Sequence, residues 1–261
     1  MRVHAIQTGT VTIRERQRRG APGPLRRLRM LTDRVWTEPL PILAWLIEHP
    51  EGLIAVDTGE TARASEPGYW PSWHPYYRRC VRVSVEPEEE IGPRLRALGA
   101  EPDDVRWLVM THLHTDHAGG LGYFPRSEIV IARTEFEYAS GRLGRLRGYI
   151  NQHWPDWLQP TLVDPGGALT AAGDIQLIPT PGHTPGHMSV VVERGERRLL
   201  LAGDASYSEQ LMLDGLVDGV SPSAKAARAT LARLRAMVAE RPTAYLPTHD
   251  PESVRRLQAA G

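Results

Sequence analysis

The chain has 261 residues, in which 31 lysine and arginine residues balance 31 aspartate and glutamate residues, and it holds ten histidines but a single cysteine, Cys80. A net charge of zero argues against a protein built mainly to coat nucleic acid or an anionic membrane, and one cysteine excludes an internal disulfide framework or a site of several thiolates. No apolar run approaches the roughly 18 residues of a membrane span, and residues 1–10 lack the pattern of a signal peptide. We therefore expect a soluble, cytoplasmic protein.

Short apolar runs separated by glycine and proline predict a fold rich in strands and turns. In chain order, the predicted strands are residues 3–8, 42–48, 52–56, 107–111, 128–132, 175–179, 189–193, 198–202 and 244–246. The second and third of them read as a hairpin around His49-Pro50-Glu51.

Fewer segments have helical periodicity. The clearest follows Ser221, a residue type that caps helices, with Pro222 at the first helical position and apolar residues at helical spacing from 227 to 238. Segments 88–98 and 134–140 are further candidates. Strands in runs, separated by surface helices, predict an α+β fold in which two sheets pack face to face with helices outside.

No linker divides the chain, so we predict one domain over residues 1–261, with excursions from the scaffold at 14–40 and 60–85. The first excursion opens with an arginine-rich arm, and the second is rich in tryptophan, tyrosine and proline. Long excursions of this kind are often lids or subunit contacts.

Four residues of metal-binding types lie within six positions directly after the predicted strand 107–111: His112, His114, Asp116 and His117. The end of a strand can point the alternate side chains of His112 and His114 to one side. The turn that follows then brings Asp116 and His117 toward the same place from another direction. Neutral imidazole and carboxylate suit zinc or a comparable first-row metal. Four ligands from one short loop rarely complete one tetrahedron, which favours two metals sharing them.

Three later predicted strands also end at a candidate ligand, namely His183, Asp204 and His249. Glycine flanks the first two, where the backbone can turn tightly around an ion. Each residue alone is a weak signal, but four strand ends that each deliver a histidine or an aspartate predict one shared metal site.

The motifs His-x-His-x-Asp-His, Gly-His-x-x-Gly-His, Gly-Asp and a late Thr-His-Asp resemble those of the metallo-β-lactamase fold superfamily, over residues 3–249. The resemblance implies an αββα sandwich of two mixed sheets with the metal site at one edge. It assigns one metal to His112, His114 and His183, the other to Asp116, His117 and His249, and the bridge between them to Asp204. It also implies that Asp57 supports the site from behind the ligands. We expect His187 to orient its loop by hydrogen bonds.

Within the superfamily, the segment Gly203-Asp204-Ala205-Ser206-Tyr207 resembles the N-acyl homoserine lactonases, in which a tyrosine three residues after the bridging aspartate assists the reaction. Tyr207 takes that position; the alternative is an amphipathic surface tyrosine. Many lactam-cleaving relatives use a cysteine ligand, whereas Cys80 lies far from every motif here, which argues against a true β-lactamase.

The resemblance therefore implies a quorum-quenching hydrolase with two divalent metal ions, zinc first and iron, manganese or cobalt as alternatives. A metal-bridging hydroxide would attack the lactone carbonyl, Tyr207 would donate a hydrogen bond to the carbonyl or the departing ring oxygen, and Asp116 would help to transfer a proton to the leaving alkoxide. The alternatives are another hydrolase of the fold, acting on other lactones, thioesters (as glyoxalase II does) or organophosphates, and a catalytically idle binding protein.

The two excursions leave choices open. The aromatic residues of the second form either an apolar wall for an acyl chain or an ordinary covering loop, and Trp154 and Trp157 pose the same choice. These residues are Tyr69, Trp70, Trp73, Tyr76 and Tyr77. The arginine-rich arm is interpreted as a solvated or subunit-contacting segment, and the resemblance suggests a homodimer. Nucleic acid is not an expected partner, because nothing else resembles the substrate-binding insertions of the superfamily's nucleases.

Overall fold

Two mixed sheets account for the strands in the computed structural model, which describes residues 1–21, 23 and 25–261. The first sheet has the order β4-β1-β2-β3-β5-β6-β7, and the second has the order β12-β11-β10-β9-β8. The first contains β1 (Arg2–Ile13), β2 (Leu40–His49), β3 (Gly52–Val56), β4 (Val81–Ser84), β5 (Val105–Met110), β6 (Glu128–Ala132) and β7 (Thr161–Val163). The second contains β8 (Gly167–Ala168), β9 (Ile175–Pro179), β10 (Met188–Arg194), β11 (Arg197–Gly203) and β12 (Thr243–Pro247).

The predicted hairpin is confirmed: β2 and β3 pair antiparallel down to His49 opposite Gly52. Gly52 closes the turn with φ 132, a conformation that favours glycine. From β3 onward the first sheet is parallel through β5, β6 and β7, so their carboxyl ends meet at one edge.

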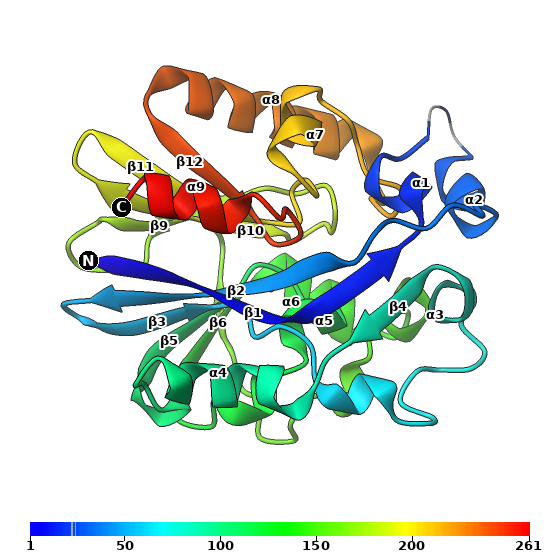
Figure 1. The fold of residues 1–261 in the computed structure, drawn as a ribbon, viewed down its shortest axis with the longest axis horizontal. Helices are drawn as coiled ribbons and strands as arrows, with labels where there is room; N and C mark the ends of the chain where they lie inside the picture. The colour runs from blue at the N-terminus through cyan, green and yellow to red at the C-terminus, as the bar shows by residue number, and fades with distance from the viewer. Residues whose placement is uncertain (22, 24) are drawn as a thin grey trace.

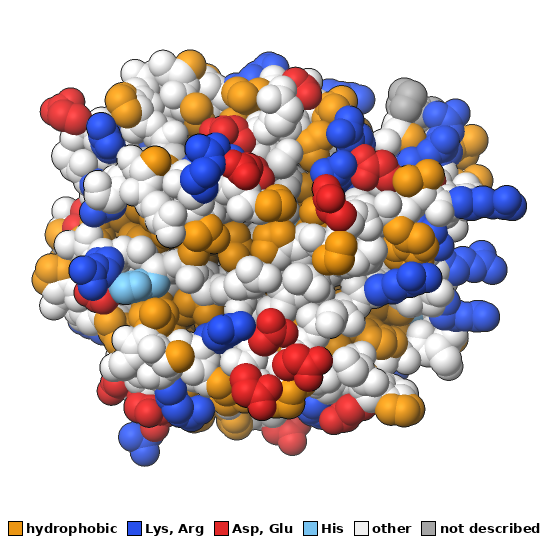
Figure 2. Space-filling model, viewed as in Figure 1, with side chains coloured by type: hydrophobic (Ala, Val, Ile, Leu, Met, Phe, Trp, Pro, Cys, Tyr) orange, Lys and Arg blue, Asp and Glu red, His pale blue; other side chains and the backbone are white. Residues whose placement is uncertain are grey.

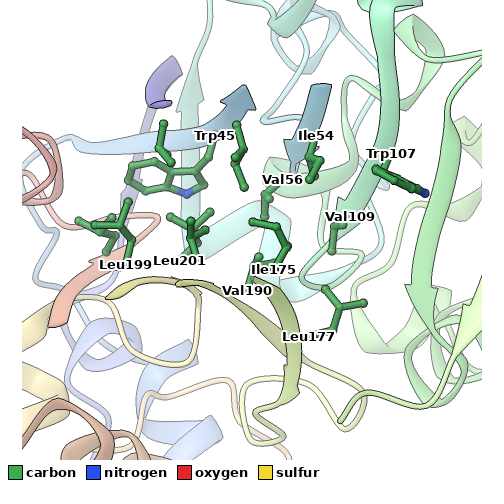
Figure 3. Packing of buried hydrophobic residues seen from close by; sticks show 14 of the residues in the cluster. Trp45, Ile54, Val56, Trp107, Val109, Ile175, Leu177, Val190, Leu199 and Leu201 are labelled. Atoms are coloured by element: carbon green, nitrogen blue, oxygen red, sulfur yellow. The ribbon is translucent and has the colours of Figure 1, made fainter. Parts of the chain in front are cut away.

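The main apolar core lies between the two sheets. Trp45, Val56 and Val109 from the first sheet point toward Val190 and Leu201 from the second (Figure 3). Alternate residues of each strand face inward, as the period of a strand requires. Burying these side chains holds the sheets face to face.

Helices cover the two outer faces, so that Figure 1 shows four layers. Ile91 and Leu95 of α4 (Ile91–Ala97) pack on the first sheet, and Leu231 and Leu234 of α8 (Ala224–Glu240) pack on the second. The predicted α+β sandwich, with helices outside two mixed sheets, is confirmed.

The helices are α1 (Glu15–Arg18), α2 (Arg26–Leu31), α3 (Pro75–Arg79), α4 (Ile91–Ala97), α5 (Thr115–Ala118), α6 (Arg133–Ser140), α7 (Glu209–Leu213), α8 (Ala224–Glu240) and α9 (Ser253–Ala259). Short 3₁₀ turns span Ala62–Ser65, Pro87–Glu89, Pro102–Asp104, Leu121–Tyr123, Arg145–Arg147 and Asn151–His153. None of the helices in the described part of the chain has the length and hydrophobicity needed to cross a membrane.

The predicted cap of α8 is wrong by two residues. Ser223 is the N-cap, and its Oγ accepts a hydrogen bond from Ala226 N at 3.2 Å. Ser221 is instead buried, with its hydroxyl donating to Asp218 Oδ2 at 2.7 Å. Pro222 therefore lies before the helix. The prediction failed because Ser221 hydrogen bonds to the carboxylate of Asp218 instead of capping the helix.

The two predicted excursions lie at the end of the sandwich opposite the chain termini, where Figure 1 places α1, α2, α3 and β4. Pro22 and Pro24, inside the first excursion, lie outside the described residues. The last residues of the second form β4, which pairs with β1. Arginine and lysine side chains gather over this end (Figure 2), and Arg14 lies over the ring of Trp36 with 3.6 Å between the guanidinium carbon and the ring centroid.

Candidate metal centre

Turns that follow four strands bring the candidate ligands together. The turn after β5 carries His112 and His114, and α5 continues it with Asp116 and His117. The other three candidates, His183, Asp204 and His249, follow β9, β11 and β12. All seven enter groups in which histidine nitrogens and carboxylate oxygens lie within 4.8 Å of one another.

The first cluster consists of three imidazoles. His114 Nδ1 lies 3.1 Å from His112 Nε2 and 3.0 Å from His183 Nε2. Without a cation, these three ring nitrogens can only share a proton among themselves. Their spacing is close to the edge of a zinc tetrahedron, about 3.3 Å for Zn–N bonds of about 2.05 Å. One cation among them would satisfy all three lone pairs.

The second cluster consists of Asp116, His117 and His249, and the carboxylate of Asp204 lies between it and the first. His249 Nε2 lies 3.3 Å from both Asp116 Oδ2 and Asp204 Oδ1, and His117 Nε2 lies 3.4 Å from Asp204 Oδ1. The other oxygen of Asp204, Oδ2, faces His183 Nε2 at 3.4 Å. Asp204 thus presents one oxygen to each cluster, which is the arrangement of a bridging ligand.

Three buried atoms in and beside the second cluster have no hydrogen-bond partner among the described residues: His117 Nε2, Asp204 Oδ1 and His249 Nε2. Buried polar atoms are nearly always paired. Imidazole nitrogen and carboxylate oxygen are also the donors that first-row divalent metals accept. The residues therefore fit a pair of divalent cations.

In three of the candidate ligands, the ring nitrogen that faces away from the clusters, Nδ1, has a hydrogen-bond partner. His117 Nδ1 meets Asp57 Oδ2 at 2.8 Å, His249 Nδ1 meets the carbonyl of Pro41 at 2.8 Å, and His183 Nδ1 meets Asp218 Oδ2 at 3.4 Å. Such partners fix the ring orientation and the tautomer of a metal-binding histidine. Asp57 was anticipated. Asp218 was not, because it follows no strand and its sequence neighbours resemble an ordinary turn.

Asp57 holds its place through an unusual backbone. It is the non-glycine residue with a positive φ, 60°, in the described chain, a conformation that aspartate tolerates better than most residues. Its carboxylate also accepts hydrogen bonds from Thr111 N at 2.7 Å and Thr111 Oγ1 at 2.8 Å. The same carboxylate therefore ties the ends of β3 and β5 to His117.

His187 lies behind Asp204 and outside both clusters. Its Nε2 accepts a hydrogen bond from Asp204 N at 3.0 Å, so the proton sits on Nδ1, which donates to Thr180 Oγ1 at 2.8 Å. Burial, reinforced by the charge of His183, lowers the pKa of His187 to about 3, so the ring is neutral. It positions the backbone of the turn that carries Asp204.

A carboxyl group that the sequence did not reveal links the two loops of the first cluster. Glu135, buried in α6, accepts hydrogen bonds at Oε1 from Leu113 N at 3.1 Å and from Tyr149 OH at 2.9 Å, and at Oε2 from Thr184 Oγ1 at 2.6 Å. Leu113 lies between two candidate ligands, and Thr184 follows His183. In sequence, Glu135 resembles any other polar residue of a short helix.

The charges of the metal-free site favour protonated histidines in the second cluster. Burial lowers the pKa of His249, but the negative charges of the neighbouring Asp204 and Asp116 outweigh this effect and raise the pKa to about 10. In the first cluster, burial and the neighbouring His183 lower the pKa of His114 to about 3. In the metal-free protein, the bound protons are therefore held mainly by the histidines that face Asp116 and Asp204.

We expect metal binding to release protons. At pH 7.5, well below its raised pKa, His249 is protonated in the metal-free protein, and Nε2 must lose that proton to bind a cation. Titration calorimetry of chelated protein with zinc, in two buffers of different ionisation enthalpy, should show release of at least one proton per chain. His249→Asn should release fewer protons than the wild type. Equal heats in the two buffers would contradict the expectation.

A cavity of about 440 Å³ opens onto the clusters, and His114, Asp116 and His249 lie among its lining residues. Four residues of the aromatic segment line its walls: Trp70, Trp73, Tyr76 and Tyr77. Its size is typical of small-molecule sites. For these four residues, the apolar-wall interpretation is the one that the structure supports.

The other aromatic residues in question pack elsewhere. Tyr69 is buried and stacks on His153 with ring centroids 4.5 Å apart. Trp154 stacks on Phe136 at 6.0 Å, and Trp157 is exposed. For these three, the interpretation as ordinary packing or covering residues holds.

Tyr207 lines the same cavity. Only 4% of the residue is exposed, and its ring stacks on that of His249 with centroids 5.4 Å apart. The alternative of a surface tyrosine is therefore wrong. The hydroxyl accepts a hydrogen bond from Gln17 Nε2 at 3.1 Å.

Comparisons with known proteins identify the family of this chain. A family model described as the metallo-beta-lactamase superfamily matches residues 37–249. The chain belongs to the metallo-β-lactamase superfamily. An N-acyl homoserine lactonase of Bacillus thuringiensis is 33% identical over 217 residues, 82% of each chain. The N-acyl homoserine lactonase AttM of Azorhizobium caulinodans is 31% identical over 227 residues, 82% of this chain and 83% of that one.

A solved structure of an N-acyl homoserine lactone hydrolase, with the product N-hexanoyl-L-homoserine bound at its catalytic metal centre, superposes with a TM-score of 0.81. The two chains are 28% identical, and the match covers 97% of this chain and 94% of the other. The superfamily, the lactonase relatives and the candidate site together identify this chain as a metal-dependent hydrolase.

Proposed function

We propose that this single-domain hydrolase opens the lactone ring of N-acyl homoserine lactones and so inactivates a bacterial quorum signal. The observation that carries the proposal is the position of Tyr207, which stacks on His249 in a cavity that Asp204 also lines and that has an aromatic wall. The lactonase relatives support the same substrate class.

Two divalent cations held by His112, His114 and His183 and by Asp116, His117 and His249, with Asp204 shared, would lower the pKa of a water and polarise the ester carbonyl. We propose zinc, which suits imidazole and carboxylate ligands. Metal analysis should find about two ions per chain, and iron, manganese or cobalt in its place would correct that choice. A homodimer and a cytoplasmic location stay predictions.

The chain's own groups supply the remaining chemistry. The hydroxyl of Tyr207 donates a hydrogen bond to the lactone carbonyl or to the departing ring oxygen, where negative charge develops. Asp116, at the edge of the cavity, helps to deliver a proton to the leaving alkoxide. The aromatic wall holds the acyl chain away from water.

A pH-stat assay tests the proposal, because opening a lactone produces a carboxylate and releases a proton. N-hexanoyl homoserine lactone should be hydrolysed much faster than a thioester or a phosphotriester, and exhaustive chelation should abolish the activity. Rapid cleavage of the thioester or the phosphotriester without turnover of the lactone would favour the other hydrolases of the fold.

Tyr207→Phe should lower kcat on the lactone by about 10- to 100-fold, because a donor to the developing charge is lost. The metal content should stay at that of the wild type, since the phenol belongs to neither cluster. Tyr123→Phe removes a hydroxyl that hydrogen bonds to Glu90, away from the cavity, and serves as the control. An unchanged kcat for Tyr207→Phe would remove its assigned role.

A further inference from the structure

Gln17 stands apart from the rest of the arginine-rich arm. It is the buried residue of α1, with 3% of its surface exposed, and it lines the cavity. Its carbonyl accepts a hydrogen bond from Gly219 N at 2.7 Å, so α1 is fixed against the segment that follows Asp218 (Figure 1). A Cβ on Gly219 would meet Gln17 Cα at 2.9 Å. The arm therefore places one polar side chain firmly beside the candidate site.

The amide of Gln17 binds two phenols at once. Nε2 donates to Tyr76 OH at 2.9 Å and to Tyr207 OH at 3.1 Å. An amide nitrogen has two hydrogens and accepts nothing, so both tyrosines act as acceptors and keep their own protons. The reverse amide orientation would leave two buried N–H donors without acceptors, against one unpaired carbonyl oxygen in the observed orientation.

Both phenolic protons are therefore available to the cavity. In the described part of the chain, neither Tyr76 OH nor Tyr207 OH donates to another residue. Burial, with the charges of Asp116 and Asp204, raises the pKa of Tyr76, so it is a neutral donor near pH 7. Two bonds to one nitrogen place the two hydroxyl oxygens roughly 5 Å apart.

The two phenols occupy different parts of the cavity. Tyr207 stacks on His249, beside the metal clusters, whereas Tyr76 belongs to the aromatic wall of α3. A lactone with an acylamino group on its α-carbon carries an ester at the reacting end and an amide carbonyl a few bonds away. When the acyl chain lies along the aromatic wall, the amide carbonyl points toward that wall.

We propose that Gln17 is a positioning residue that holds Tyr76 and Tyr207 as paired hydrogen-bond donors, Tyr207 for the ester and Tyr76 for the substrate's amide carbonyl. The pair makes the site select α-acylamino lactones over lactones without the amide. This inference rests on the proposed lactonase function and deepens it. A site built to hydrogen bond a substrate group discriminates strongly against analogues that lack it.

The test compares N-hexanoyl homoserine lactone with α-heptyl-γ-butyrolactone, which has the same ring and a hydrocarbon in place of the acylamino group. Tyr76→Phe should lower kcat/KM on the amide substrate about tenfold, mainly through KM, and change the hydrocarbon analogue less than twofold. Tyr123→Phe is the control, and metal content and melting temperature verify the fold of each variant.

Gln17 gives a second, independent readout. Gln17→Glu replaces a donor by an acceptor of the same shape, so both phenols turn their protons toward it and away from the substrate. It should lower kcat/KM on the amide substrate at least as much as Tyr76→Phe does, and lower kcat on both substrates. Gln17→Leu, which removes the bonds but leaves the protons free, should be milder than Gln17→Glu.

The outcomes separate the two proposals. Equal losses on both lactones for Tyr76→Phe would overturn the assignment of Tyr76 to the amide and leave lactonase activity standing. Wild-type activity in folded Gln17→Glu would overturn the role of Gln17. A wild-type protein that opens neither lactone would overturn the proposed function and this inference together.

Discussion

Asp204→Asn is expected to reduce lactone turnover by about a thousandfold or more and to lower the metal content below two ions per chain. The carboxylate presents Oδ1 to His117 and His249 and Oδ2 to His183. An amide keeps the shape but offers one oxygen and no charge, so it cannot hold both cations. Metal analysis beside the pH-stat assay measures both effects.

The same substitution has a second signature in the chelated protein. Asp204 is the main group that raises the pKa of His249 against the effect of burial, so Asn at this position should lower that pKa and reduce the protons released on metal binding. Asp156→Asn makes the same chemical change at an exposed position and should leave activity and metal content unchanged. A variant at Asp204 with two tightly bound metals would show that the bridge is not formed.

Most strands and all candidate ligands were predictable because each produces a pattern within a short stretch of sequence. Apolar runs bounded by turn residues predicted β2, β3, β5 and, in the second sheet, β9, β10, β11 and β12, whereas the two-residue β8 was not predicted. Each candidate ligand lies in the turn after such a run or, for Asp116 and His117, in the short helix that continues that turn. The resemblance of these motifs to a known superfamily then assigned the candidate ligands to one shared site.

Apart from Asp57 and His187, which the motifs suggested, the residues behind the ligands were not predictable in this way. Gln17 reaches Tyr207 across 190 positions, and Asp218 reaches His183 across 35. No periodicity connects such partners; only the packed fold does. Helices shorter than two turns, such as α1 and α5, also carry too few residues to show an amphipathic pattern. The cap of α8 moved because a tertiary hydrogen bond to Asp218 outweighed a local preference.

The supporting residues share one design. Asp57, Asp218 and Glu135 each connect the loop of a candidate ligand to a different strand or helix by hydrogen bonds to buried groups. The loops are therefore held in place before any cation binds. Preorganisation of this kind raises metal affinity and keeps catalytic geometry fixed.

The variant Glu135→Ala tests whether these hydrogen bonds hold the ligand loops, and its effects on stability and metal affinity are the second largest that we expect. It leaves Leu113 N–H, Thr184 Oγ1 and Tyr149 OH without their shared acceptor, and each unpaired buried group costs about 1–3 kcal/mol. We expect the free energy of unfolding to fall by about 3–5 kcal/mol. Metal affinity should fall about 10- to 100-fold, because the loops that carry His112, His114 and His183 lose their common anchor.

Two variants make the result specific. Glu137→Ala changes an exposed carboxylate on the same helix and should alter unfolding by less than about 0.5 kcal/mol. Glu135→Gln keeps one acceptor oxygen and should fall between Glu135→Ala and the wild type. Denaturant titration of the metal-loaded and chelated forms separates the loss of metal from the loss of packing. If Glu135→Ala destabilises the metal-loaded and chelated forms equally, metal affinity is unchanged, and the carboxylate stabilises the fold but does not anchor the ligand loops.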